Sequence, residues 1–209
     1  RTLVLINGKR VNQQSQAYLN RTPGKGEVGV NLKSIPIAAV ERIEVLRDGA
    51  SSQYGSDAMA GVMNFILKKD SAFSTLNAST GITSAGDGFQ FNIDYNTTLP
   101  FGNGGRVNLT LAYTDQERTN RAGAPGTSSF DTATARQNEI DFAIKDPTLG
   151  MIIGRPDLKQ KNVFVNITHP LGKNSEFYTT HGYTDRWNRS FAYYRFPGWR
   201  RDVADAGFL

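Results

Sequence analysis

Cysteine is absent from the sequence, so neither a disulfide framework nor a thiolate metal site can form. Long hydrophobic runs are absent too: no stretch approaches the roughly 18–20 apolar residues of a transmembrane helix, and mean hydropathy is −0.43. A helical membrane protein is therefore excluded, whereas a membrane β-barrel is not, because its signal is alternation. A strong excess of one charge is also lacking, since 24 Lys and Arg oppose 19 Asp and Glu. The basic residues are dispersed, so we expect no nucleic-acid partner.

Motifs for catalysis or metal binding are lacking as well. The segment "GASSQYG" is not a G-x-S-x-G nucleophile elbow, and no carboxylate pair stands out as an acid/base couple. The two histidines, His169 and His181, fall on separate predicted strands, and we expect surface or interfacial side chains there. The glycines at the segment "GASSQYG" and just after it, Gly49, Gly55 and Gly61, do not have the G-x-G-x-x-G spacing of a dinucleotide-binding loop. We expect no enzyme, no cofactor and no metal site.

What is present begins with a mixed segment over residues 1–70. The run "TLVLING" predicts a strand followed by a hairpin turn at Asn7-Gly8. Ser34 could cap a short helix that carries Pro36 near its start. Strands are predicted at residues 42–46 and 61–69, with small residues between them. These features predict a small mixed α+β unit.

From residue 72 onward the pattern has period two. Residues 89–97, 106–114 and 162–169 each place apolar side chains on one face and mostly Asn and Thr on the other. Residues 73–83 and 176–184 match this pattern less cleanly. The turns "PFGNGG" and "PLGKN" are tight, whereas a long polar loop covers residues 115–160. Aromatic residues near strand ends would suit an interfacial girdle: Tyr95, Phe101 and Tyr113.

Two architectures explain this alternation. A soluble antiparallel sandwich buries the apolar face in its core, and periodicity alone slightly favours it. A transmembrane β-barrel turns the apolar face to lipid, and the strand lengths and the polar second face favour the barrel.

The segments "LVLINGKRV" and "VNLKSIPIAAVERIEVLRDGASSQYGSDAMAGVMNFILKK" closely resemble the plug domain of TonB-dependent outer-membrane receptors. The departures are small: Asn7 where Asp is frequent, Asp48-Gly49-Ala50 for Gly-Pro, and Lys68-Lys69 for Thr-Lys. The resemblance implies a mainly β protein. Residues 1–70 would be the C-terminal part of the plug, and residues 71–209 the N-terminal strands and loops of an incomplete barrel. The complete family member has about 22 strands.

The resemblance also implies a function at the Gram-negative cell outer membrane. The complete protein would import a scarce nutrient, such as an iron siderophore, haem, cobalamin or an oligosaccharide. Its partners would be TonB with ExbB and ExbD, which supply energy from the proton gradient, together with outer-membrane lipid and a small extracellular ligand. We expect the chain to be a piece of that protein, without the TonB box. Two alternatives remain: a non-transporting surface or signalling protein with the same architecture, and a soluble binding module.

Candidate site residues follow from the resemblance and from composition. In the family, charges of the "ERIEVLR" segment pair with the barrel wall, which implies that role for Glu41, Arg42, Glu44 and Arg47. Structural glycines of the plug would be Gly8, Gly49, Gly55 and Gly61. The segment "FAYYRFPGWRR" supplies aromatic side chains that could stack on a ligand or anchor at the membrane interface: Tyr193, Tyr194 and Trp199.

Overall fold

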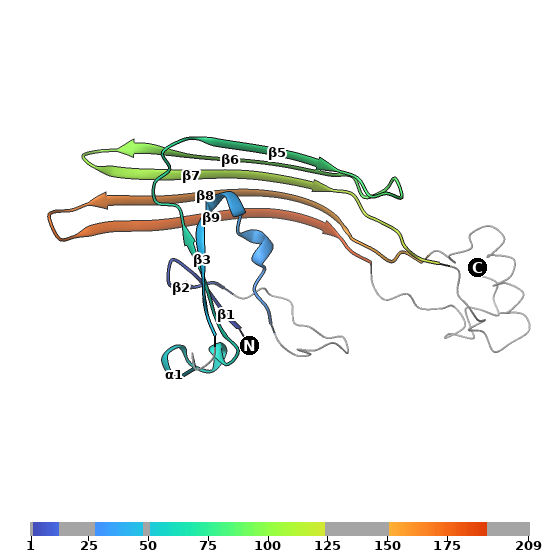
Figure 1. Ribbon diagram of the computed structural model, residues 1–209, viewed down its shortest axis with the longest axis horizontal. Coiled ribbons are helices and arrows are strands. Elements are labelled where there is room, and N and C mark those ends of the chain that lie inside the picture. The colour runs from blue at the N-terminus through green and yellow to red at the C-terminus, as the bar shows by residue number, and fades with distance from the viewer. Residues whose placement is uncertain (1, 13–27, 48–50, 124–150, 192–209) are drawn as a thin grey trace, which may run out of the picture. The chain divides into compact units, whose positions relative to one another are not determined.

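The computed structural model describes residues 2–12, 28–47, 51–123 and 151–191 (Figure 1). The chain forms two compact units. The first comprises residues 1–78, 92–113 and 160–185, and the second comprises residues 79–91, 114–159 and 186–209. The first unit contains a complete small sheet and, from a larger sheet, part of one strand and most of four long strands. Each unit is described by itself below.

A four-stranded mixed sheet forms the N-terminal part of the first unit, with the order β2-β1-β4-β3. Its strands are β1 (Thr2–Ile6), β2 (Lys9–Arg10), β3 (Val40–Leu46) and β4 (Gly61–Leu67). Strand β1 pairs parallel with β4, and β3 pairs antiparallel with β4. The predicted turn between β1 and β2 is present, with φ of 48° at Asn7 and 76° at Gly8. Both angles are positive, as a two-residue hairpin turn requires.

Short helical segments connect these strands. They are η1 (Leu32–Ser34), η2 (Ile37–Ala39), α1 (Ser51–Tyr54) and η3 (Ser56–Ala58). The expected Ser34 cap is wrong: Ser34 ends η1 and its hydroxyl donates to the Asn31 carbonyl, whereas η2 begins after Pro36. The N-cap position of η2 is Pro36, and no side chain makes a capping hydrogen bond there. None of the helices in the described residues is long and apolar enough to be a membrane span.

The small sheet has an apolar cluster on each face. One contains Leu3, Leu5, Val62 and Ala58, with Tyr54 packed against it. The other contains Val4, Phe65 and Ile35. Alternation along β1 and β4 sends successive side chains to opposite faces, so two short strands supply both clusters. The small residues between β3 and β4 allow α1 and η3 to fold closely against the first cluster, where Ala58 is fully buried.

A five-stranded sheet follows, with the sequential order β5-β6-β7-β8-β9. Its strands are β5 (Thr75–Gly81), β6 (Gln90–Phe101), β7 (Gly105–Gln116), β8 (Asp157–Pro170) and β9 (Glu176–Arg189). The strands predicted from alternation are all present. Strands β6 to β9 extend beyond their predicted C-terminal ends, whereas β5 is shorter than the predicted residues 73–83. The β6–β7 connection is the expected tight turn, in which Gly102 and Gly104 have positive φ.

The burial of the long strands distinguishes the two architectures left open by their periodicity. Within the first unit, the polar face is buried: Asn96, Asn108, Thr110, Gln160, Asn162, Asn166 and Thr168. On the opposite, apolar face, Leu99 is 52% exposed and Leu111 is 41% exposed. A soluble sandwich would show the reverse. The arrangement is that of a barrel wall with a polar interior, and the mainly β class with a small mixed α+β part is confirmed.

Candidate functional site: a polar interface between the two sheets

Side-chain amides on the polar face of β8 bond to backbone carbonyls of the small-sheet segment. The three bonds run from Gln160 Nε2 to Lys33 O at 2.6 Å, from Asn162 Nδ2 to Ser34 O at 2.7 Å and from Asn166 Nδ2 to Lys68 O at 3.0 Å. Two of these carbonyls lie at the end of η1, where a short helix leaves acceptors without partners of its own. The β8 amides satisfy them.

A hydrogen-bonded chain connects the β1–β2 turn with the end of β4 through β8 and β9. Asn7 Nδ2 donates to the hydroxyl of Thr180 at 3.2 Å, and that hydroxyl donates to Asn166 Oδ1 at 2.9 Å. The other side of the Asn7 amide accepts from the N–H of Leu67 at 2.9 Å. Each polar group named in this series of hydrogen bonds has a partner, as buried polar groups require.

A second polar network lies between β6, β7 and the segment that follows β4. Asn96 Nδ2 donates to Asn108 Oδ1 and to Thr110 Oγ1, each at 2.8 Å. Ser71 Oγ donates to Asn96 Oδ1 at 2.9 Å, and Asn108 Nδ2 donates to Thr98 Oγ1 at 2.9 Å. Asn96 and Thr110 are 0% exposed. This network bonds Ser71, which follows β4, to side chains of β6 and β7.

Two exposed ion pairs connect the same segment to the strands. Lys69 Nζ lies 2.8 Å from Glu176 Oε1, and Arg106 Nε lies 3.3 Å from Asp70 Oδ2. Both pairs are open to solvent, so each contributes little to stability and is screened by salt.

One apolar contact interrupts this polar interface. Phe164 of β8 forms a buried cluster with Ala39 and Leu67. Its ring also lies over Gly182 of β9, where an added Cβ would approach ring atoms to 2.8 Å.

In the second unit, Asp87 joins the β5–β6 loop to the segment after β7. Arg121 donates to both carboxylate oxygens of Asp87, at 2.6 and 2.8 Å, and the Asn120 N–H donates at 3.0 Å. Hydrogen bonds from the Arg121 side chain, then from the Thr83 hydroxyl and the Asn120 backbone, hold the pKa of Asp87 well below its usual range. The carboxylate is therefore ionised at neutral pH and fixes this loop.

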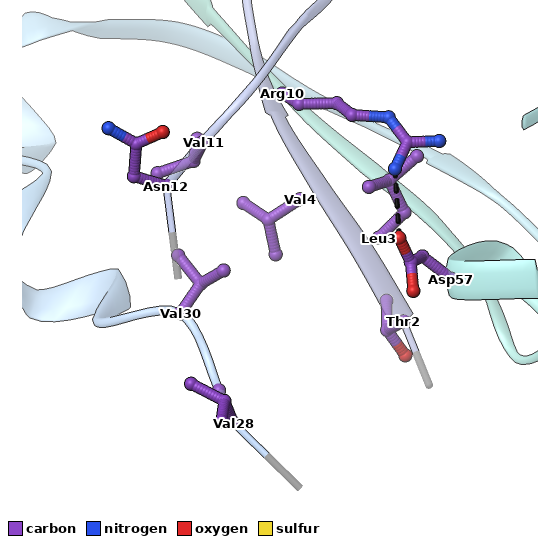
Figure 2. A pocket seen from close by; sticks show the side chains of 10 residues that line it. Thr2, Leu3, Val4, Arg10, Val11, Asn12, Val28, Val30 and Asp57 are labelled. Carbon is purple, nitrogen blue, oxygen red and sulfur yellow. Dashed lines mark hydrogen bonds and ion pairs between the residues drawn. The ribbon is translucent and has the colours of Figure 1, made fainter. Parts of the chain in front are cut away.

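A cavity of about 440 Å³ lies beside β1 and β2 in the first unit. Figure 2 shows Val4, Val11 and Val30 converging on it, with Arg10 bonded to Asp57 at its side. The Arg10 Nη1 to Asp57 Oδ2 distance is 2.8 Å. This pairing neutralises both charges. In the described part of the chain, no group of His, Cys, Asp and Glu side chains could hold a metal ion.

The sequence-predicted charged residues lie on β3 or just after it. Arg42 pairs with Glu41 at 3.0 Å and with Glu44 at 2.9 Å, and Asn64 of β4 donates to Glu44 at 3.1 Å. Arg47 is exposed. The bonds of Arg42 are therefore made within the small-sheet segment, and the predicted wall contact of the four residues stays a prediction.

The other predicted site residues are only partly within the described chain. Gly8, Gly55 and Gly61 all have positive φ, and a Cβ at Gly61 would meet the Leu46 carbonyl at 2.5 Å. Gly49, Tyr193, Tyr194 and Trp199 lie outside the described residues. Sequence reasoning missed the Asn, Gln and Thr side chains of β8 and β9 as contact residues. The available signal was the polar face itself.

Residues 1–62 match the family model described as TonB-dependent Receptor Plug Domain. This part of the chain is thus similar to the plug domain of TonB-dependent receptors, and we call residues 1–70 the plug and the five-stranded sheet the wall. The vitamin B12 transporter BtuB of Vibrio vulnificus (strain CMCP6) is 27% identical over 175 residues, which cover 84% of this chain and 22% of that transporter. The chain thus spans about a fifth of this relative.

Solved structures agree on the fold of the plug and the strands that follow it. The ferric enterobactin receptor PfeA of Pseudomonas aeruginosa, in complex with enterobactin, matches with a TM-score of 0.64 and 22% identity, covering 90% of this chain and 25% of the receptor. Another structure of that receptor gives a TM-score of 0.66 at 19% identity, with the same coverage. The small sheet and the five-stranded sheet therefore share the fold of the matching part of that receptor. In this chain the polar face of the five-stranded sheet contacts the small-sheet segment.

Proposed function

We propose that the receptor containing this chain imports a scarce nutrient across the outer membrane of a Gram-negative bacterium. The observation that carries the proposal is the chemistry of the plug–wall interface. Amides of the wall bond to backbone carbonyls of the plug, and water can replace each such bond. The net stabilisation from one bond is about 0.5–1.5 kcal/mol, so the contacts can be exchanged one at a time. A plug that must close a wide barrel and later move needs such an interface.

The parts of the chain have separate roles in this proposal. Residues 1–70 are the C-terminal part of the plug, and residues 71–209 supply barrel strands and loops. Glu41, Arg42, Glu44 and Arg47 contact the barrel wall in the complete receptor. TonB with ExbB and ExbD transmits energy from the inner-membrane proton gradient, and the protein acts as a transporter and not as an enzyme.

The ligand is a small extracellular nutrient of the kinds that such receptors carry. The relatives' names refer to vitamin B12 and ferric enterobactin, which supports cobalamin or an iron siderophore, with haem and oligosaccharides as further candidates. Tyr193, Tyr194 and Trp199 are the proposed ligand-facing aromatics, because planar side chains stack on sugars and on aromatic chelators.

Growth under nutrient limitation tests the proposal. A strain lacking the receptor is grown with cobalamin, a ferric catecholate siderophore, haem or an oligosaccharide as the limiting source. We expect loss of growth on one source, recovery with the wild-type gene, and no recovery when TonB is also deleted. Undiminished, TonB-independent growth on every source would contradict import.

A non-transporting signalling receptor is the alternative, because the same plug and barrel can report ligand binding without moving it. Uptake of radiolabelled ligand by whole cells distinguishes the two. Import requires TonB-dependent accumulation inside the cell, whereas a signalling receptor binds the label at the surface and changes transcription without accumulation.

A further inference from the structure

Phe164 interrupts the polar pattern of β8. Positions 160, 162, 166 and 168 on the same face are Gln, Asn, Asn and Thr, and all are buried. A phenylalanine among them places a large apolar ring on the polar face of the wall. Strand pairing does not require a phenylalanine at position 164, because backbone hydrogen bonds join neighbouring strands.

The ring is covered by the plug. Phe164 is 8% exposed and clusters with Ala39, the last residue of η2, and Leu67, the last residue of β4, each of which is 2% exposed. The backbone at the same two places is joined by the bond from the Lys68 N–H to the Ala39 carbonyl at 2.9 Å. The ring therefore contacts the plug at the point where the end of η2 and the end of β4 are bonded to each other.

Gly182 limits the position of the ring from the other side. A Cβ at this glycine would lie 2.8, 3.0 and 3.2 Å from three Phe164 ring atoms, closer than ordinary contact. Any larger residue at position 182 would push the ring away from β9. The ring is thus held between the Gly182 backbone and the plug residues Ala39 and Leu67.

Two of the polar bonds of β8 are made by residues on either side of Phe164 in the strand. Asn162 donates to the Ser34 carbonyl on one side, and Asn166 donates to the Lys68 carbonyl on the other. A buried aromatic ring between them keeps water from both bonds, and hydrogen bonds are stronger where water is excluded. Removing the ring would open a cavity that admits water to both.

We infer that Phe164 positions the plug against the barrel wall, with Gly182 as the surface on which its ring rests. This inference rests on the proposed plug-in-barrel function. It adds that one aromatic residue, with polar contacts on either side, determines where the plug lies against the wall. Phe164 is a positioning residue, since it acts through Ala39 and Leu67.

Thiol labelling in the complete receptor, purified in detergent, tests the inference. The chain has no cysteine, so an Ala39→Cys variant introduces a thiol beneath the ring, and labelling of the receptor without this substitution supplies the background. With Phe164 present we expect slow reaction with a maleimide. With Phe164→Ala we expect labelling to be faster by about tenfold or more, because a buried aromatic contact is lost.

Matched variants make the result specific. Val163→Ala removes an apolar side chain from the neighbouring, partly exposed position, and it should leave labelling unchanged. Phe164→Leu should restore most of the protection. Gly182→Ala, which keeps Phe164 but displaces its ring, should raise labelling. Heat-modifiable migration of each variant on a gel verifies that the barrel is closed.

Equal labelling in the Phe164→Ala, Gly182→Ala and wild-type backgrounds, with closed barrels, would overturn the inference. The measurement needs neither ligand nor TonB. A failed labelling test would therefore leave the import proposal standing, and a failed growth test would leave the positioning role of Phe164 standing.

Discussion

Asn166 on β8 and Thr180 on β9 are joined by a hydrogen bond of 2.9 Å, in which the threonine hydroxyl donates to the amide oxygen. Each partner also reaches the plug: Asn166 donates to the Lys68 carbonyl, and Thr180 accepts from Asn7. Two neighbouring wall strands thus hold two separate points of the plug through one side-chain pair.

Replacing Asn166 by Ala should loosen the end of β4. The substitution removes the side-chain donor of the part-buried Lys68 carbonyl, a loss of about 0.5–1.5 kcal/mol for a typical hydrogen bond. We expect the Leu67 amide, which donates to Asn7, to exchange hydrogen roughly twofold to tenfold faster. Hydrogen-exchange mass spectrometry on the complete receptor measures this rate.

Asn77→Ala is the matched control, because Asn77 is also an asparagine on a wall strand but donates to Asp94 in an exposed pair. It should leave exchange at Leu67 unchanged. Equal rates in Asn166→Ala and wild type would show that Asn166 does not hold this segment.

Replacing Asn7 separates its backbone role from its side-chain role. Ala at this position loses the bonds to Leu67 and Thr180, and it keeps a Cβ at a φ of 48° without the short polar side chain that helps Asn adopt this conformation. Gly loses the same bonds without the strain, which is about 1–2 kcal/mol for a left-handed residue. We expect denaturant unfolding of the complete receptor to rank wild type above Asn7→Gly and Asn7→Gly above Asn7→Ala. Equal stability of Gly and Ala variants would show that the turn is not strained.

The Lys69–Glu176 pair should contribute only weakly and lose its contribution in salt. Both side chains are about half exposed, so a double-mutant cycle with Lys69→Ala and Glu176→Ala should give a coupling of about 0.2–1 kcal/mol. In 1 M NaCl the Debye length is about 3 Å, and the coupling should fall toward zero. A coupling that persists in salt would contradict a solvent-screened pair.

Asp87 should make its loop dependent on pH at the acid extreme. The folded pKa lies below the unfolded value, so the carboxylate stabilises the loop fully above the unfolded pKa of about 3.9. That stabilisation is lost as pH falls through the folded pKa. At neutral pH, Asp87→Asn should speed exchange of the Asn120 amide, and the difference from wild type should shrink on strong acidification.

Hydrogen exchange at the two pH values measures this effect, with each rate corrected for the intrinsic pH dependence of exchange. Asp70→Asn is the control, because Asp70 is an aspartate whose exposed ion pair is with a different partner, Arg106. A difference between Asp87→Asn and wild type that stays constant down to the acid limit would contradict the titration of Asp87.

Much of the fold was predictable from local patterns. Asn7-Gly8 indicated a hairpin turn because only a few residues accept two consecutive positive φ angles. Alternation along residues 89–97, 106–114 and 162–169 indicated strands because side chains of a strand alternate between faces. Ser34 was predicted wrongly as a cap, since the same hydroxyl can bond to the preceding turn and the sequence does not distinguish the two.

The contact residues of the plug were not predictable in the same way. The motif directed attention to the charges of β3, where Arg42 bonds to its neighbours Glu41 and Glu44. The wall amides that hold the plug, such as Asn162 and Asn166, belong to a strand more than ninety positions further along the chain. Their partners are backbone carbonyls, which carry no sequence signal.

The amino-acid sequence by itself determined the strands, the side chains that share each face and the plug motif, because these depend on neighbouring residues and on a period of two. Only the tertiary structure decided that the polar face is the buried one and that Phe164 contacts Ala39 and Leu67. Alternation specifies two faces without specifying which is covered. That choice depends on segments distant along the chain that come together only in the folded protein.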